Sequence, residues 1–303
     1  MTSRHVPENV PRTALVLGGG GSTGNAWLIG IVAGLVDAGL DVTEADLTIG
    51  TSAGSTAAAQ VAGASPADLL AAILTAVPEH RAGAVAADRG RVPARPAGDH
   101  LDRLGRIIAS SEDAADLRRR LGAAALDLDA ESDGSWQERW RATVASRLPS
   151  PNWPNRTVRI TAVDARSGAP VVFDRQSGVD LADAVAASCA SGLPYRIGDD
   201  RYIDGGYRSN ADNADLAAGY DRVLVLSPFG GRSLTPVHWG THLAHQVDEL
   251  RAHGSRVVTV FPEKGSEHLF GGNAMDPSLR PTAARAGRDQ GRALAVELGE
   301  FWR

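Results

Sequence analysis

The sequence has 303 residues, of which 43% are hydrophobic, 22% charged and only 5% aromatic, as in a globular protein with a mainly aliphatic core. The formal net charge of −5 excludes a general electrostatic attraction to nucleic acid or to anionic membranes, so we expect no nucleic-acid partner. The single cysteine, Cys189, excludes an internal disulfide and a multi-cysteine metal site, and we expect no metal or other cofactor. The chain shows neither a signal-peptide pattern nor an uninterrupted apolar stretch of roughly 18 residues, which predicts a soluble, cytoplasmic protein.

The N-terminal part begins with a strand–helix–strand–helix pattern. The apolar run TALVLG (13–18) predicts a buried strand that ends in the glycine loop GGGGSTG (18–24). Apolar residues at helical spacing then predict a helix over 26–38. A second strand, DLTIG (46–50), precedes a helix that ends at Gly63. This order predicts a sheet that is at least partly parallel.

Residues 64–150 carry mostly helical patterns, and we interpret them as an outer helical layer in preference to a lid over the site. The segment 65–77 opens with a good N-cap, whereas 80–100 is rich in Arg, Gly and Pro and predicts an irregular loop. Further helices are expected around 101–109, 113–125 and 135–147.

The C-terminal half returns to strands. A hairpin is expected from strands at 157–164 and 170–174, joined through the turn sequence RSG. The remaining expected elements, in chain order, are a helix at about 180–190, strands at 201–204 and 221–228, a long helix at about 236–253, a strand at 255–262 and a helix at about 279–299. Without an internal repeat or a low-complexity linker, residues 1–303 are expected to form one domain, with its motifs in 13–215 and further strands and helices in 216–303.

The pentapeptide GTSAG places Ser52 between Gly50 and Gly54, directly after a predicted strand and before a predicted helix. This is the context of a nucleophile elbow, where the glycines allow the strand and helix to cross closely and expose the serine. The helix N-terminus also favours negative charge on an oxygen beside it. Ser52 is therefore a candidate nucleophile.

The glycine loop allows two interpretations. Gly19, Gly21 and Gly24 match the G-x-G-x-x-G fingerprint of dinucleotide-binding proteins, so a Rossmann-type nucleotide binder is one alternative. That fold needs an acid at the carboxyl end of its second strand to hold the ribose, but Asp46 precedes the strand. In the other interpretation, the bare N–H groups of the loop form an oxyanion hole beside Ser52.

Two kinds of residue are candidates for the base that would accept the proton of Ser52. Three histidines fall on one face of the helix expected over 236–253, which permits a Ser-Asp-His triad of the α/β-hydrolase kind. These are His238, His242 and His245. Asp204 follows a short strand and precedes two glycines in YIDGG, so its side chain, like that of Ser52, projects from a turn whose nearby glycines lack side chains. None of the eight histidines has such a turn context.

The motifs LVLGGGGSTG, GTSAG and DGG, in this order, resemble those of the patatin-like phospholipases, and AVAASCASGLPY (184–195) is similar to that family's Ala-Ser-x-Ala segment. The resemblance covers approximately 13–215. It implies a three-layer α/β/α fold with a mostly parallel central sheet, and a dyad of Ser52 as nucleophile and Asp204 as base. It also places the oxyanion hole on the N–H groups of Gly19, Gly20 and Gly21, to which the elbow geometry adds Ala53.

The sequence departs from the family pattern at two places. The family often has Arg or Lys before the last glycine of the loop, but this chain has Thr23, which leaves the binding of a phosphate head group in doubt. An Asn-Pro pair often follows the aspartate motif, where this chain has Asn213-Ala214 at best.

The resemblance implies a serine hydrolase that cleaves acyl esters of lipids, of the phospholipase A or lysophospholipase type. The expected partners are a lipid or phospholipid substrate and, transiently, a membrane surface. Cys189 is expected to be a small buried residue near the site. A Ser-Asp-His esterase and a Rossmann-type nucleotide binder are the alternatives.

Overall fold

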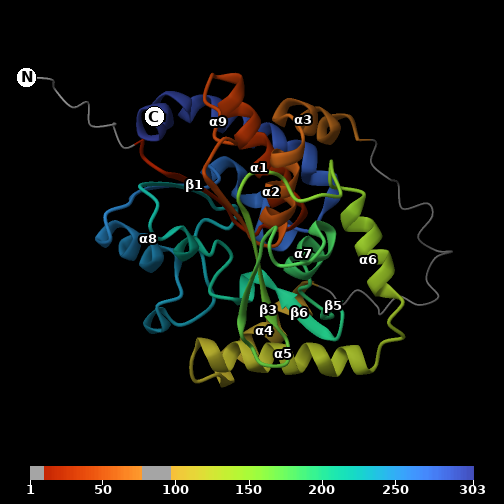
Figure 1. Ribbon diagram of the computed structural model, residues 1–303. Helices are drawn as coiled ribbons and strands as arrows, with labels where there is room; N and C mark the ends of the chain where they lie inside the picture. Colours follow the sequence, from red (N-terminus) through yellow and green to blue (C-terminus); the bar gives the residue numbers. More distant parts are fainter. Residues whose placement is uncertain (1–9, 77–96) are drawn as a thin grey trace, which may run out of the picture.

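A computed structural model describes residues 10–76 and 97–303 (Figure 1). Most of the irregular loop expected at 80–100 lies outside the described residues, and 97–100 belong to a helix. None of the helices in the described ranges is long and apolar enough to cross a membrane.

The described residues form an eight-stranded sheet in the order β5-β6-β3-β2-β1-β7-β8, with β4 also paired to β3. Strands β3, β2, β1, β7 and β8 are parallel, whereas β4, β5 and β6 are antiparallel to their neighbours. The bounds are β1 (Thr13–Leu17), β2 (Leu47–Gly50), β3 (Val158–Asp164), β4 (Pro170–Phe173), β5 (Tyr195–Ile197), β6 (Asp200–Asp204), β7 (Arg222–Leu226) and β8 (Arg256–Val260).

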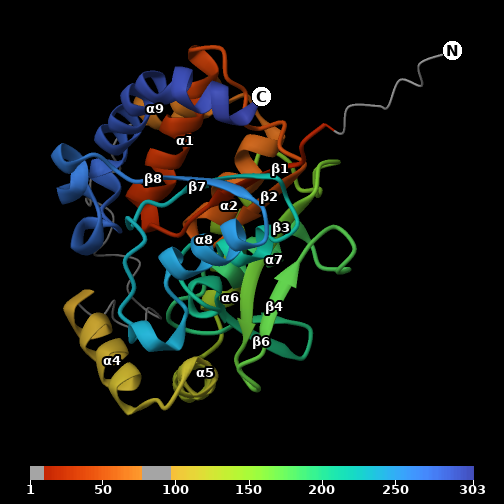
Figure 2. The same ribbon diagram turned by 90° about the vertical axis from the view of Figure 1, so that its left-hand side faces the viewer.

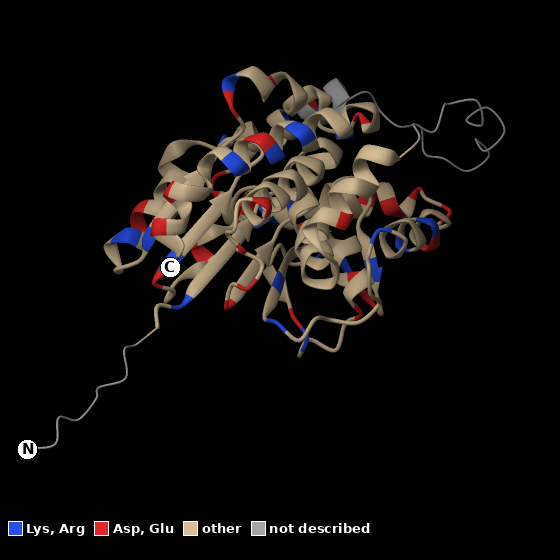
Figure 3. Cartoon of the chain, turned by 90° about the horizontal axis from the view of Figure 1, so that it is seen from above, with Lys and Arg blue, Asp and Glu red and all other residues tan. Residues whose placement is uncertain are grey.

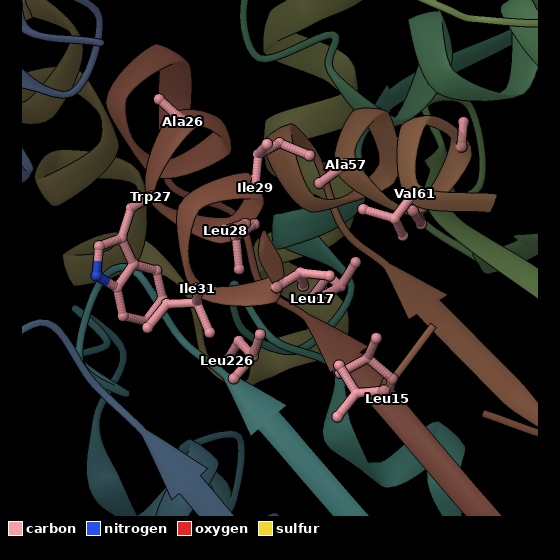
Figure 4. Packing of buried hydrophobic residues seen from close by; sticks show 14 of the residues in the cluster. Leu15, Leu17, Ala26, Trp27, Leu28, Ile29, Ile31, Ala57, Val61 and Leu226 are labelled. Carbon is pink, nitrogen blue, oxygen red and sulfur yellow. The ribbon is translucent and has the colours of Figure 1, made fainter. Parts of the chain in front are cut away.

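Helices cover both faces of this sheet. The helices are α1 (Gly21–Asp37), α2 (Ala53–Gly63), α3 (Pro66–Thr75), α4 (Ala97–Ser110), α5 (Ala114–Ala130), α6 (Trp136–Ala145), α7 (Leu181–Ser188), α8 (Leu243–Ala252) and α9 (Arg280–Trp302). Side chains of β1 point alternately to the two faces: Leu15 and Leu17 pack with α1 and α2 (Figure 4), and Ala14 and Val16 with α8. Figure 2 shows α1 and α9 side by side on one side of the sheet, with α8 on the other. The expected three-layer α/β/α fold with a mostly parallel sheet is confirmed.

The helices of 64–150 divide between the two sides of the sheet. Helix α3 packs on α1, in the layer that also holds α9. Helix α5 instead contributes Leu117 and Leu121 to a cluster with Val163 of β3 and Ile203 of β6. The antiparallel end of the sheet is thereby covered by α5.

Two elements differ from expectation. The prediction of one helix over 236–253 is wrong for its first half, because α8 begins only at Leu243. A 3-10 turn at Val237–Trp239 precedes it and ends at Gly240, whose φ of 68° does not continue a helix. The short strand β5 was not expected, since its three residues carry too little pattern.

Glycines at the elbow are required by close backbone contacts. A Cβ on Gly54 would overlap the carbonyl group of Leu17, and one on Gly50 would lie 2.6 Å from the Cα of Ser55. Backbone atoms cannot move aside as a side chain can. The strand, the turn and α2 therefore approach each other as closely as the pentapeptide predicts.

Replacing Gly54 with alanine should lower the free energy of unfolding by about 3 kcal/mol or more, because the new methyl group overpacks against backbone. Urea denaturation followed by circular dichroism measures this change. Gly105→Ala is the matched control, because a Cβ there meets nothing within 4 Å and the helix α4 should gain up to about 1 kcal/mol. Equal stability of the two variants would contradict the close crossing.

Candidate active site

Ser52 occupies a strained turn between β2 and α2. Its φ of 51° and ψ of −120° lie in a region that non-glycine residues rarely adopt. The N–H group of Ser52 donates to the Oγ of Ser188 (2.9 Å), which fixes the turn from the end of α7. The conformation is that of a nucleophile elbow, with Ser52 at the N-terminus of α2.

The register of the sheet brings Asp204 to the same place. Strand β3 pairs with β2 up to the pair of Gly50 with Ile160, and β4 occupies the opposite edge of β3. Past the end of β2, β6 pairs with the same edge of β3 that β2 occupies, and there Asp204 pairs with Ala162. Asp204 thus lies two residues past the end of β2, at the level that Ser52 reaches two residues after Gly50.

The side chains of Ser52 and Asp204 are in direct contact. The Oγ of Ser52 donates to Oδ2 of Asp204 at 2.9 Å, and the N–H of Gly206 donates to Oδ1 at 2.8 Å. Asp204 is only 7% exposed. Burial raises the pKa of its carboxyl group to about 6, although the hydrogen bonds from Gly206 and Ser52 oppose this shift. A carboxylate of this kind is a better proton acceptor than an exposed aspartate.

A buried polar network holds the two turns together. Asn213 donates from Nδ2 to the Oγ1 of Thr51 and to the carbonyl oxygen of Gly205, both at 3.0 Å. Thr161 of β3 also donates to the Oγ1 of Thr51 (3.0 Å). In the described residues, Asn213 and Ser52 are the non-glycine residues with positive φ. Asn213, considered in the sequence only as a weak match to Asn-Pro, therefore links the residue before Ser52 to the residue after Asp204.

The glycine loop lies against Ser52, but its N–H groups are not equivalent. A Cβ on Gly19 would be 3.5 Å from the Cβ of Ser52. The N–H of Gly19, however, donates to the carbonyl oxygen of Ala211 at 2.7 Å, so the expectation that Gly19 contributes to an oxyanion hole is wrong in this conformation. Within the described chain, the N–H groups of Gly20, Gly21 and Ala53 have no such acceptor. These three remain available to an oxyanion.

The Rossmann alternative does not fit the position of Asp46. Its Oδ2 accepts a hydrogen bond from the N–H of Thr13 at 2.7 Å, at the start of β1. The glycine loop follows Leu17, at the other end of that strand. Asp46 is therefore a whole strand length away from where a ribose would be held.

The histidine alternative lacks a hydrogen bond to the dyad from any histidine whose side chain is described. The three candidates do not share a helix face, because only His245 lies within α8, where it pairs with Glu249 (3.2 Å). His242 precedes α8 and bonds the carbonyl oxygen of Thr235 at 2.7 Å. None of the histidines whose side chains are described bonds Ser52 or Asp204. These are His238, His242, His245, His253 and His268.

Cys189 lies beside α2, near the site as expected, with its Sγ 3.7 Å from the Oγ of Ser55, and it is partly buried. Over residues 10–76 and 97–303, no group of three or more His, Cys, Asp or Glu side chains could hold a metal ion.

One comparison with known proteins shows the family. A sequence model described as patatin-like phospholipase matches residues 15–217, more than half of the 303 residues. No curated protein matches the sequence significantly. Among solved structures, VipD from Legionella pneumophila is similar with 13% identity and a TM-score of 0.46, over 95% of this chain and 67% of that chain.

The type III effector ExoU is similar with 17% identity and a TM-score of 0.39, over 95% of this chain and 53% of that chain. ExoU of Pseudomonas aeruginosa in complex with SpcU gives 18% identity and a TM-score of 0.40, over 95% and 52% of the two chains. The present chain thus spans about half the length of the ExoU chains. On the family match over 15–217, the chain belongs to the patatin-like phospholipases, a family of lipid ester hydrolases.

Proposed function

We propose that this protein hydrolyses acyl esters of lipids, as a phospholipase A or lysophospholipase, with Ser52 as nucleophile and Asp204 as base. The observation that carries the proposal is the 2.9 Å hydrogen bond from Ser52 Oγ to the buried carboxylate of Asp204. The strained turn at Ser52 and the free N–H groups around it supply the two other requirements of acyl transfer, an exposed nucleophile and a site for an oxyanion.

The reaction follows from these groups. Asp204 accepts the hydroxyl proton while the Oγ of Ser52 attacks the acyl carbonyl carbon, and the N–H groups of Gly20, Gly21 and Ala53 stabilise the oxyanion. The tetrahedral intermediate collapses to an acyl-Ser52 ester, and the leaving alcohol takes the proton from Asp204. Asp204 then takes a proton from a water molecule while the water oxygen attacks the acyl carbonyl carbon. The bond from this carbon to the Oγ of Ser52 breaks, Asp204 returns its proton to that Oγ, and the fatty acid leaves.

A pocket next to Asp204 suits an apolar acyl chain. Its lining includes Ile203 of β6 and Tyr207, on either side of the Asp204 turn. Helices α4 and α5 complete the wall with Leu104, Ile107 and Leu121. We propose a transient contact with a membrane surface, from which such a chain would enter.

The pH dependence of kcat/KM should follow the carboxyl group of Asp204. Only the ionised form accepts a proton, and burial raises its pKa to about 6. Below pH 6, kcat/KM should therefore fall about tenfold per pH unit, with a plateau above it. Steady-state hydrolysis of p-nitrophenyl butyrate across pH 4.5–8.5, as an assay range of roughly four units, measures the profile.

Asp212→Asn is the control for this profile. Asp212 is a second buried carboxyl group, beneath the glycine loop, and burial raises its pKa to about 7. If Asp204 is the base, Asp212→Asn leaves the inflection near pH 6. If the inflection is lost in Asp212→Asn, it belongs to Asp212, and its assignment to Asp204 is wrong.

The experiment that tests the function is a panel of lipid esters assayed with wild type and Ser52→Ala together. Phospholipids, lysophospholipids, monoacylglycerols and triglycerides are incubated with each protein, and released fatty acid is measured. The proposal expects release from at least one phospholipid or lysophospholipid by wild type only. Release from none of these esters by folded wild-type protein, or equal release by Ser52→Ala, would overturn it.

A further inference from the structure

Arg280 places a positive charge beside the glycine loop. From the first turn of α9, its Nη1 donates to the carbonyl oxygen of Ser22 (2.7 Å) and its Nη2 to the Oδ1 of Asn25 (3.0 Å), both in the first turns of α1. These acceptors are neutral, and no carboxylate of the described residues forms an ion pair with Arg280. Burial, followed by the positive charge of Arg147, lowers the pKa of the guanidinium group to about 10. Arg280 is thus a half-buried cation without a counter-ion.

Arg147 adds a second positive charge to this place. A chain of hydrogen bonds connects the two arginines: Asn25 donates to the Oε1 of Gln60 (2.9 Å), and Gln60 donates to the carbonyl oxygen of Arg147 (3.1 Å). The guanidinium group of Arg147 lies over the ring of Trp140, at 5.8 Å from its centroid. Among the described residues, Arg147 forms no ion pair either.

This pair of cations lies close to the nucleophile. Asn25, which accepts a hydrogen bond from Arg280, itself donates to the carbonyl oxygen of Ala53 at 3.5 Å, one residue after Ser52. Helix α1 starts at Gly21, so the positive end of its dipole faces the same region. An anion attached to the substrate near its ester would meet all of these groups together.

The position of Thr23 supports the same conclusion. Its Oγ1 donates to the carbonyl oxygen of Ala274 at 3.4 Å and its side chain is fully buried, so Thr23 takes no part in binding an anion. The positive charge at this end of the loop therefore comes from Arg280, in a segment that the family match does not include. Positive and negative side chains are otherwise interspersed over the helices (Figure 3), so the pair is a local feature and not part of a basic face.

We propose that Arg280, assisted by Arg147, binds the phosphate group of the substrate and makes the enzyme selective for phosphate-bearing lipid esters over neutral ones. This inference rests on the proposed function. A guanidinium group recognises a phosphate through two parallel N–H bonds, and at a partly buried site such bonds are about twice as strong as neutral ones. Arg280 is thus a specificity-determining residue.

The test compares two substrates that differ only in the phosphate, lysophosphatidic acid and monoacylglycerol with the same acyl chain. We expect wild type to have a kcat/KM at least about tenfold higher for lysophosphatidic acid. Arg280→Gln keeps donors for Ser22 but loses the charge, and should lower the ratio of the two kcat/KM values by about tenfold or more. Arg288→Gln is the matched control, because Arg288 lies further along α9 and pairs with Asp37 (2.7 Å). It should leave the ratio unchanged.

A purely structural role for Arg280 predicts a different result, an equal loss on both substrates, which would overturn the inference. Arg147→Gln is the second variant in case Arg280→Gln does not fold, since the Arg147 side chain is exposed and only its backbone bonds Gln60. It should lower the ratio by about threefold. An unchanged ratio in Arg147→Gln and in folded Arg280→Gln would overturn the inference.

Inhibition by inorganic phosphate distinguishes a site for the phosphate group of a lipid from a site for free phosphate. Inorganic phosphate should inhibit lysophosphatidic acid hydrolysis competitively in wild type and much less in Arg280→Gln. If it inhibits while wild type shows no preference between the lipids, the site binds free phosphate and the substrate inference fails. Hydrolysis of both lipids without preference leaves the proposed function standing, whereas hydrolysis of neither contradicts the function itself.

Discussion

Replacing Ser52 with alanine should lower kcat/KM for ester hydrolysis by roughly 10⁴-fold or more, because no acyl-enzyme can form without the hydroxyl group. Steady-state hydrolysis of p-nitrophenyl butyrate and of the preferred lipid measures the loss. The fold should be retained, since among the described residues the Oγ of Ser52 bonds only Asp204. Loss of this buried hydrogen bond should lower the free energy of unfolding by at most about 3 kcal/mol.

Ser55→Ala is the matched control for this loss. Ser55 lies one turn further along α2 and its Oγ donates to the carbonyl oxygen of Ser52 at 2.6 Å. It is a buried serine of the same segment with no contact to Asp204, and its replacement should cost less than about tenfold. Comparable losses in the two variants would mean that disturbance of α2, and not the nucleophile, explains the result.

Replacing Asp204 with asparagine should lower kcat/KM by about 10³-fold or more, because the amide has the same shape but cannot accept the proton of Ser52. The variant should also lose the decline in kcat/KM below pH 6. Above pH 6, its free energy of unfolding should not be lower than that of wild type. An aspartate with a raised pKa favours folding most at low pH, and this contribution disappears as pH rises through about 6.

Replacement of the three histidines, one at a time by glutamine, tests the alternative triad. His238, His242 and His245 form no hydrogen bond with the dyad, so each variant should keep its activity within about threefold of wild type. If one of them instead loses as much as Asp204→Asn, a histidine is the base and the dyad is wrong.

The beginning of the fold follows from local pattern. Strand β1, the glycine loop and α1 succeed each other within 25 residues, and each carries its own signal: an apolar run, then glycines, then helical spacing. The elbow at Ser52 is equally local, because Gly50 and Gly54 are required by the crossing of β2 and α2. The strand–loop–helix beginning and the elbow can therefore both be predicted from the sequence.

The meeting of Ser52 with Asp204 was implied only by the resemblance. The two residues are 152 positions apart, and what joins them is the register of β6 on the edge of β3 beyond β2. Pairing of strands so far apart in sequence has no signature within either strand. Asn213 was underestimated for the same reason, since its partners Thr51 and Gly205 come from two other segments.

The remaining differences also come from tertiary contacts. The N–H of Gly19 is taken by Ala211, a residue whose position depends on the turn after Asp204. Arg280 meets the start of α1 across 255 positions, and nothing in the composition of α9 marks it as different from Arg288. Helical spacing over 236–253 predicts one helix, but Gly240, with its φ of 68°, ends the 3-10 turn before α8 begins.

The most direct test of the Ser–Asp dyad is covalent labelling with a fluorophosphonate, followed by peptide mass spectrometry. We expect one label per chain, on Ser52, formed rapidly by wild type and at least about 10²-fold more slowly by folded Asp204→Asn. Absence of labelling in folded wild-type protein, labelling of another serine, or equal rates in wild type and Asp204→Asn would contradict the dyad.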